Sequence, residues 1–275
     1  ALRVKLFDNF EGLYERGIIL TELERRYKAL LVQYRKDLTD IESGYYRNCD
    51  LVDTFDDLAP IYHNLPPVAG AIYWARSSAK RINEPLAKLM FYGQALKEVP
   101  PELNHAQTQH QTLLQMLQTY EADRYREWVA TQVEVGKEKL KMKLLRRTEK
   151  TGLIRVNFDP ALVAMLREVR FFLIFDIEVP EAALEIFSRA TTYRKQVAQF
   201  DHIVSMYNAV LTELLPVEEP MLEDRIAKMD QALMPGLMDL RWIHQEKIPE
   251  FIESAMKVVS DVKGVVDILK NNLRN

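Results

Sequence analysis

The sequence contains one cysteine, nine glycines and no apolar run that approaches the roughly 20 residues of a membrane-spanning helix. The single cysteine, Cys49, excludes an internal disulfide framework and is typical of a reducing compartment. Neither G-x-x-x-x-G-K-[ST] nor G-x-G-x-x-G occurs, so no glycine-rich loop is expected to cradle phosphates. The first residues also lack a signal-peptide pattern. These absences argue against secreted disulfide-rich, membrane-spanning and nucleotide-binding proteins.

Charge is nearly balanced along the chain. The 275 residues include 37 basic and 40 acidic side chains, which give a net charge of −3 and argue against a dedicated nucleic-acid surface. A hydrophobic content of 48% is ordinary for a protein that forms a core, and the length suits one large or two small domains. Both ends fall within or beside apolar-periodic segments, so we expect the sequence to be a piece of a longer chain.

Helical periodicity dominates the sequence. Thr21 and Glu24 form a capping-box pattern that predicts the start of a long amphipathic helix. Its predicted buried stripe consists of Leu23, Tyr27, Leu30, Tyr34, Leu38, Ile41 and Tyr45. A shorter helix is predicted before it, at residues 4–14.

Prolines divide the remaining helical segments. Pro66 and Pro67 suit the first turn of a helix, and Asn83 is predicted to cap a separate short helix after it. Apolar spacing predicts further long helices at 102–140, 180–214, 222–240 and 249–273. Gly136 is expected to weaken the helix that contains it.

One stretch near the middle reads as strand. Ile154, Val156 and Phe158 alternate with polar residues, and the polar turn TEKTG separates them from the apolar segment 144–147. We therefore predict a β-hairpin, and because a lone hairpin is marginal in water, these three side chains should face helices. Asp159 and Pro160 then suit the N-cap and first position of a following helix.

The predicted fold class is all-α, with elongated antiparallel helical bundles and one short β-hairpin near the middle. We expect a helical bundle at residues 1–142, the hairpin at 143–158 and a second helical bundle at 159–275. The helices follow one another at regular pacing, but no fixed-period repeat indicates a strict solenoid.

No constellation of side chains predicts catalysis. Glu102 and His105 form one E-x-x-H pair, whereas a di-iron bundle needs two such pairs and two further glutamates. His110 falls on an apolar stripe and is better explained as a core residue than as a ligand. Asp56 and Asp57 lack the third carboxylate of a diphosphate-binding motif. The sequence thus predicts no catalytic, cofactor-binding or metal-binding residue, and no cofactor.

The segment from Lys137 to Lys150 has the strongest local charge bias. It could form a patch for an acidic partner or a tubulin-like surface. The favoured interpretation is a solvated helix end and hairpin strand, because Glu138 and Glu149 dilute the charge and cations suit a helix C-terminus.

Two quoted segments carry a family resemblance. LIRVNFDPALVAMLREVRFF, at 153–172, closely resembles the strand-to-helix signature of dynein heavy-chain tails, and LPPVAGAIYWARSSAKRI, at 65–82, resembles an earlier segment of that family. IEVPEAAL, YNAVLTELLPVEEPML and LMPGLMDLRWIHQEKIPEFI follow in the family's order. These segments are more similar in sequence to axonemal heavy chains, including those of the outer arm, than to the cytoplasmic form. His244 and Met221 are mild departures, since serine and leucine are commoner there.

The resemblance implies a tail (stem) segment and not the motor, whose ATPase ring lies far towards the C-terminus in this family. It implies docking of WD-repeat intermediate chains, packing against other dynein heavy chains, and a place in the cytoplasm or cytoskeleton, at the ciliary or flagellar axoneme. It implies no nucleic acid, membrane or small-molecule substrate as partner. The signature positions that transfer are structural and not contact residues: Pro66, Pro67, Gly70, Trp74, Asn157, Phe158, Asp159, Pro160, Glu168, Tyr207 and Trp242.

Two other protein classes share the helical pattern. A generic helical adaptor or tethering-complex subunit, unrelated to motors, would have similar amphipathic helices and proline-marked joints. An all-helical enzyme would need polar groups that converge in a pocket, and the sequence gives no sign of them.

Overall fold

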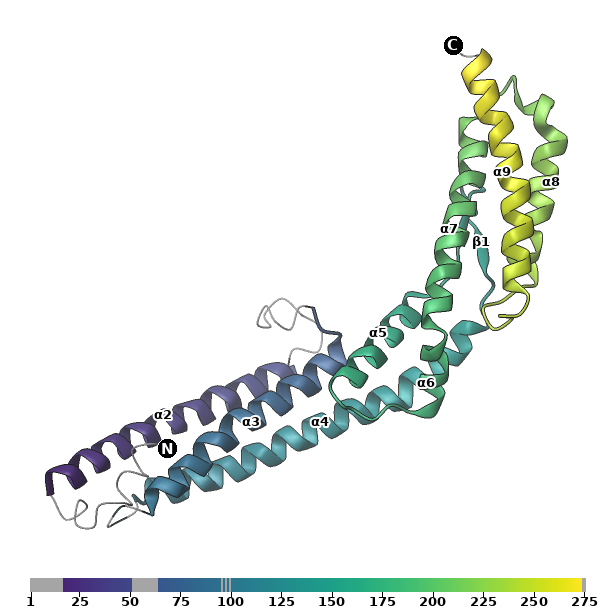
Figure 1. Ribbon diagram of the computed structural model, residues 1–275. Coiled ribbons are helices and arrows are strands. Elements are labelled where there is room, and N and C mark those ends of the chain that lie inside the picture. The colour runs from purple at the N-terminus through teal and green to yellow at the C-terminus, as the bar shows by residue number, and fades with distance from the viewer. Residues whose placement is uncertain (1–16, 51–63, 95, 97, 99, 274–275) are drawn as a thin grey trace, which may run out of the picture. The chain divides into compact units, whose positions relative to one another are not determined.

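The computed structural model describes residues 17–50, 64–94, 96, 98 and 100–273 (Figure 1). Over these residues it contains eight helices and one two-stranded antiparallel sheet, which confirms the all-α class with a small hairpin. The helix predicted at 4–14 and the acid pair Asp56 and Asp57 lie outside the described residues.

The chain divides into two compact units that meet at Glu127 and Trp128. This division falls inside helix α4 (Glu102–Leu140), so the hairpin belongs to the second unit. The three-part division predicted at 142 and 158 stays a prediction of domain organisation.

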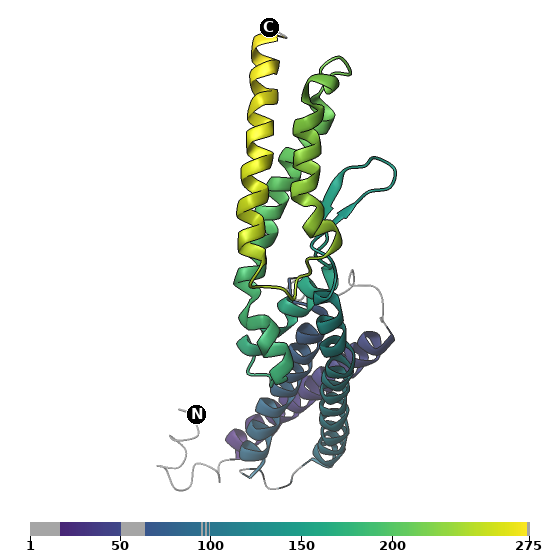
Figure 2. The ribbon, with the colours of Figure 1, turned by 90° about the vertical axis from the view of Figure 1, so that its right-hand side faces the viewer.

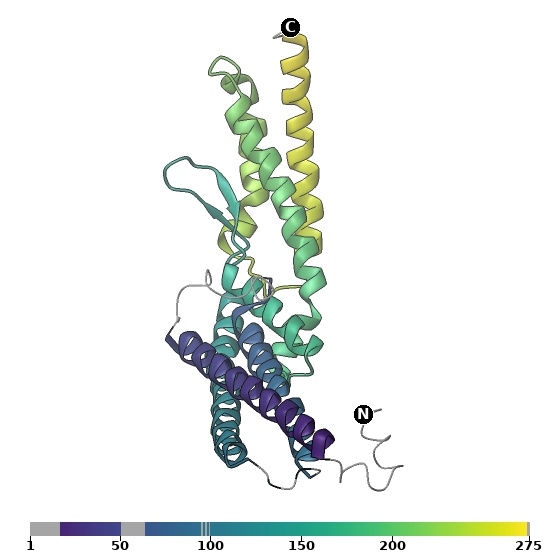
Figure 3. The same cartoon turned by 90° about the vertical axis from the view of Figure 1, so that its left-hand side faces the viewer.

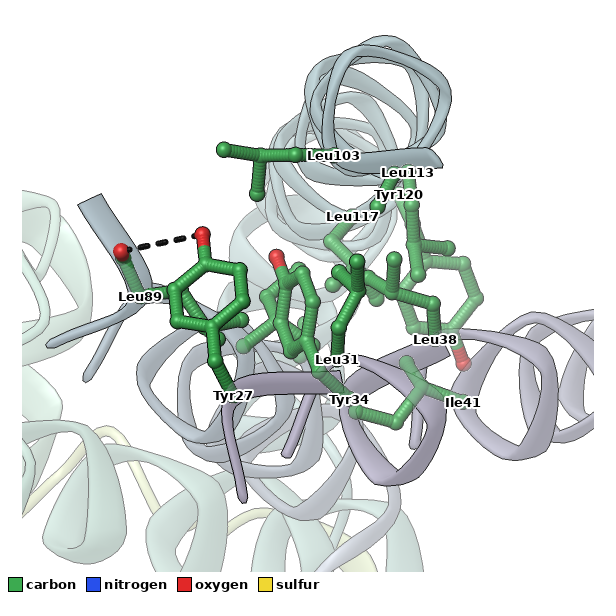
Figure 4. Close-up of a cluster of buried hydrophobic side chains, with 13 residues drawn as sticks. Tyr27, Leu31, Tyr34, Leu38, Ile41, Leu89, Leu103, Leu113, Leu117 and Tyr120 are labelled. Carbon is green, nitrogen blue, oxygen red and sulfur yellow. Dashed lines mark hydrogen bonds between the residues drawn. The ribbon is translucent and has the colours of Figure 1, made fainter. Parts of the chain in front are cut away.

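The first unit is built from α2 (Gly17–Asp50), α3 (Pro67–Gly93) and the first part of α4. Its core is a cluster of apolar side chains from all three helices (Figure 4). The α2 stripe in this core consists of Tyr27, Leu31, Tyr34, Leu38 and Ile41. Four members of the predicted stripe are thus buried, whereas Leu23 and Tyr45 are half-buried. Leu30 is 53% exposed, and its neighbour Leu31 takes the buried position.

Two predicted helix ends in this unit are wrong. Thr21 lies inside α2, where its hydroxyl donates to the Gly17 carbonyl at 2.8 Å instead of capping a new helix. Asn83 caps nothing, because α3 continues to Gly93 with Pro85 in its interior. Ile82 and Leu89 are both buried on either side of this proline, and their packing holds the helix together across it.

The second unit contains the end of α4 and seven further elements. These are β1 (Leu145–Arg147), β2 (Ile154–Val156), α5 (Pro160–Ile174), α6 (Glu181–Ser188), α7 (Ala190–Glu213), α8 (Glu219–Met238) and α9 (Ile248–Leu273). Helix α9 packs against both α7 and α8, and the hairpin lies beside α7 and α8 with its turn projecting away from them (Figures 2 and 3).

The helix predicted from 180 to 214 is interrupted. It consists of α6 and α7, which are separated at Arg189, where the backbone leaves the helical region (φ −96°, ψ 5°). Ala183 and Ile186 are the buried residues of α6, whereas Leu184 is 38% exposed. Helix α8 runs through Pro235 to Met238.

Candidate functional site

Specific hydrogen bonds and ring contacts surround the hairpin of the second unit. We call this region the hairpin joint and define it as residues 142–159 together with residues 240–243 and the side chains that bind them. The strands pair Leu145 with Val156 and Arg147 with Ile154. Ile154 is fully buried and Leu145 nearly so, which confirms an inward face, although Val156 and Phe158 are only half-buried.

The turn of the hairpin is closed by its backbone. The Thr148 amide donates to the Leu153 carbonyl at 2.8 Å, and the Gly152 amide donates to the Thr148 carbonyl at the same distance. Gly152 has φ +68°, a left-handed conformation in which a side chain is strained. The turn residues predicted from TEKTG thus join the two strands.

Asn208 of α7 pairs with the outer edge of β2. Its Oδ1 accepts from the Ile154 amide at 3.0 Å, and its Nδ2 donates to the Ile154 carbonyl at 2.9 Å. A side-chain amide offers one acceptor and two donors, so it can replace a neighbouring strand. This contact fixes the hairpin to α7 and satisfies an edge that would otherwise be open to another chain.

A second polar contact ties the hairpin to α7 and α8 together. Asp230 Oδ1 accepts from the Tyr207 hydroxyl and, at 3.0 Å, from the Arg147 guanidinium. The same guanidinium lies over the Tyr207 ring, 5.9 Å from its centre. Burial, and then the bond to Asp230, raise the pKa of Tyr207 to about 12, so the phenol remains a donor at neutral pH.

Trp242 fills the centre of the joint. Its side chain is fully buried, and its Nε1 donates to the Asn157 carbonyl at 2.8 Å. The indole meets Phe158 edge to face at 4.9 Å and Phe200 at 5.8 Å between ring centres. Aromatic pairs in this geometry add to the area they bury.

Backbone bonds extend the hairpin towards the segment around Trp242. The Leu144 amide donates to the Leu240 carbonyl at 3.1 Å, and the Trp242 amide donates to the Met142 carbonyl at 3.3 Å. Asn157 donates two hydrogen bonds to the same segment. Its backbone amide donates to the Leu144 carbonyl at 2.8 Å, and its Nδ2 donates to the Lys143 carbonyl at 3.0 Å. Segments nearly 100 residues apart in the sequence are therefore joined through their backbones.

Asp159 and Pro160 begin α5 as predicted. The Asp159 carboxylate accepts from the Ala161 amide at 2.8 Å, and Pro160 occupies the first helical position. Lys139 of α4 forms an ion pair with the same carboxylate at 2.8 Å. The Lys139 ammonium and the Ala161 amide both lower the pKa of Asp159 below its usual value.

Gly136 does not interrupt α4. A Cβ at this position would lie 2.5 Å from Met165 Sδ and 3.3 Å from Ile186 Cδ1. The absence of a side chain at Gly136 gives α5 and α6 room to approach α4. The helix therefore continues through Gly136, where the sequence predicted a weak point.

The remaining signature residues are buried, begin a helix or pack against a neighbouring ring. In the second unit, Glu168 is 5% exposed on α5. In the first unit, Pro66 and Pro67 start α3, and the Gly70 amide donates to the Pro66 carbonyl at 2.8 Å. Trp74 meets Tyr120 edge to face at 5.9 Å. The role of these positions as a family signature stays a prediction.

The polar groups of the described residues do not converge on a reacting centre. No cluster of three or more histidine, cysteine or acidic side chains is found there that could hold a metal ion. His110 is 5% exposed and hydrogen-bonded to the Tyr34 hydroxyl at 2.8 Å, as expected for a core histidine. A groove of about 390 Å³ beside α3 and α4 is lined mainly by apolar carbon, with the Arg76–Glu121 ion pair at its side. None of the helices searched is long and apolar enough to cross a membrane.

Comparison with known proteins assigns the chain to a family. Residues 1–251 match the family described as "Dynein heavy chain, N-terminal region 1". The chain belongs to the dynein heavy-chain family. It is 31% identical to the flagellar outer-arm dynein beta chain of Chlamydomonas reinhardtii and 30% identical to the ciliary dynein beta chain of Tripneustes gratilla, each over 98% of this chain. It is 27% identical to dynein axonemal heavy chain 9 of Homo sapiens, also over 98% of this chain.

The dynein chain spans about 6% of the length of these relatives. The matched part is the N-terminal region of axonemal heavy chains and not their ATPase motor, which confirms the resemblance drawn from the sequence. Membership of this family removes the alternative of an adaptor unrelated to motor proteins.

The two residues that differ from the usual dynein sequence, His244 and Met221, both lie at exposed positions. His244 is exposed, and its Nδ1 accepts from the Arg241 amide at 3.2 Å, a bond that a serine hydroxyl could also accept. Met221 is 71% exposed at the start of α8.

Sequence reasoning missed Asn208, Arg147 and Asp230 as parts of the joint. Each lies on a helix or strand whose local pattern gives it no distinct role.

Proposed function

We propose that this chain is a non-catalytic tail segment of an axonemal dynein heavy chain. In this role it acts as a helical scaffold in the assembly of the motor complex for microtubule-based movement in cilia or flagella. Two observations support the proposal. The chain matches the N-terminal region of dynein heavy chains over residues 1–251, and its most specific polar contacts hold helices and hairpin together instead of facing a substrate.

The proposed partners are WD-repeat intermediate chains and other dynein heavy chains. Their support is the resemblance of the sequence to heavy-chain tails, together with relatives that are named as outer-arm and axonemal chains. The proposal includes no nucleic acid, membrane, small-molecule substrate or cofactor. The paired polar contacts of the hairpin joint suit a scaffold, because they favour one arrangement of the elements.

Binding to an intermediate chain tests the proposal. The folded chain, checked by circular dichroism, is mixed with the purified β-propeller of an axonemal intermediate chain and, separately, with a second heavy-chain tail. We expect complex formation with the propeller at micromolar concentration in sedimentation or calorimetry. An unrelated WD-repeat propeller is the control and should not bind. If the folded chain binds neither the intermediate chain nor the second tail at this concentration, the proposal is wrong.

A further inference from the structure

Two pairs of like charges face each other across strands of the hairpin joint. In the strand register, Arg146 of β1 lies directly opposite Arg155 of β2. Lys143 lies opposite Arg241 in an isolated antiparallel bridge. All four side chains are exposed. Like charges placed directly opposite each other on a sheet are destabilising, so the fold alone does not favour this arrangement.

Within the part of the chain that the structure describes, no acidic side chain forms an ion pair with these two cationic pairs. Three other cations nearby have acidic partners: Lys139 pairs with Asp159, Lys141 with Glu138 and Arg147 with Asp230. The segment 143–156 contains five basic residues and a single carboxylate, Glu149, in a chain whose net charge is negative.

Neighbouring contacts hold the backbone on which Arg146 and Arg155 lie. Asn208 holds the backbone of Ile154, which is next to Arg155, and Asp230 holds Arg147, which is next to Arg146. The guanidinium groups of Arg146 and Arg155 thus extend from a strand pair that is hydrogen-bonded to α7 and α8. Fixed donors lose less conformational freedom on binding than flexible ones.

We propose that Arg146, Arg155, Lys143 and Arg241 form a binding surface for an extended, carboxylate-rich segment of a partner protein. The bridge between Lys143 and Arg241 lies just outside the strand pair, because Leu144 separates Lys143 from β1. The two cationic pairs therefore follow each other along one short segment of chain, and an extended acidic segment offers a row of carboxylates for them. Arginine also suits carboxylates because its planar guanidinium can donate two parallel hydrogen bonds.

An acidic protein segment fits better than two other polyanions. A nucleic-acid surface usually needs a broad basic excess, and the chain has 40 acidic against 37 basic residues. The hairpin turn carries Thr148, Glu149 and Lys150 and no aromatic or large apolar residue that could enter a membrane interface. The proposal stands independently of the intermediate-chain proposal, because the acidic segment could belong to another protein.

Fluorescence anisotropy of a labelled polyglutamate peptide tests this surface on the full 275-residue chain. The variant R146E/R155E should bind about tenfold more weakly, because two attractive charges become repulsive ones. The matched control K28E/R35E changes the net charge equally on exposed cations of α2 and should bind as the original chain does. R146K/R155K should retain most of the affinity. Added salt should weaken binding by the original chain.

A further variant separates binding from edge protection, since exposed cations also keep sheet edges from aggregating. R146Q/R155Q removes the mutual repulsion and should fold at least as stably as the original chain while binding the peptide weakly. The proposal is overturned if this variant aggregates but binds the peptide normally, or if R146E/R155E binds as well as K28E/R35E. Tighter binding to duplex DNA or phosphatidylserine vesicles than to the peptide, lost in R146E/R155E, would also overturn it.

Discussion

Each unit of this dynein tail segment has its own kind of internal contact. In the first unit, α2, α3 and α4 meet through side chains, and the polar links are single bonds. Examples are the bond from Tyr34 to His110 and the bond from Tyr27 to the Leu89 carbonyl, of which Figure 4 shows the second. In the second unit, distant segments also share backbone hydrogen bonds around Trp242 and the hairpin. A helical stripe is therefore enough to organise the first core, whereas the second requires a set of long-range polar contacts.

The largest expected effect comes from removing the centre of the hairpin joint. Trp242→Ala should lower the free energy of unfolding of the second unit by about 3–5 kcal/mol, because it leaves a large cavity and an unpaired Asn157 carbonyl. Urea unfolding followed by hydrogen exchange of each unit measures the change. The first unit should keep its stability, and an equal loss in both units would contradict the comparison.

Glycines test how tightly the second unit is packed. A Cβ at Gly236 would lie 2.7 Å from the Phe251 ring and 3.0 Å from Leu145 Cδ1, so Gly236→Ala should destabilise by about 1–3 kcal/mol. Gly264 on α9 is the matched control, because nothing lies within 4 Å of its Cβ position. Gly264→Ala should stabilise by up to about 1 kcal/mol through helix propensity. Thermal melting that shows both changes to be stabilising would contradict the packing described for α8 and α9.

The sequence predicted the local features of this fold better than its long-range contacts. The Asp159 cap and the centre of the α2 stripe follow from local rules, since each depends on spacing or on adjacent residues. The cap was predicted correctly, and so was the stripe at Tyr27, Tyr34, Leu38 and Ile41 but not at Leu30. The Asn208 bond to Ile154 joins residues 54 apart, and the Trp242 bond to Asn157 joins residues 85 apart. No local pattern encodes such a pairing, so the strand was predicted but its anchor was not. The break at Arg189 was missed for a similar reason, because apolar spacing continues across it.

A smaller effect is expected in the first unit. Tyr34→Phe removes the hydroxyl that bonds His110 Nδ1 inside the core and should destabilise this unit by about 1 kcal/mol. Tyr46→Phe is the control, because Tyr46 is 54% exposed on the same helix. Chemical denaturation of the two variants measures the difference. No difference between them would show that the buried pair does not stabilise the first core.

Acid should distinguish the units by the pH at which each loses stability. Burial lowers the pKa of His110 below 6.5, so its contribution is complete above that pH and is lost as the pH falls through the lowered value. In the second unit, Lys139 lowers the pKa of Asp159 and Lys263 lowers that of Glu213, so their contributions persist to about pH 4. Unfolding midpoints measured from pH 7 to pH 5 should fall for the first unit and stay nearly constant for the second. His110→Phe should remove the dependence, and a fall confined to the second unit would contradict the assignment.

The central claim is that the hairpin is anchored to the helices of the second unit and does not stand by itself. Native-state hydrogen exchange of the Ile154 amide tests it most directly, because this amide donates to Asn208 of α7. The account predicts that Ile154 and the Trp242 indole exchange as slowly as the buried amides of α7, and that Asn208→Leu removes the protection at Ile154. If the Ile154 amide of the original chain exchanges as fast as the turn residues at 149–151, the hairpin is unanchored and the account is wrong.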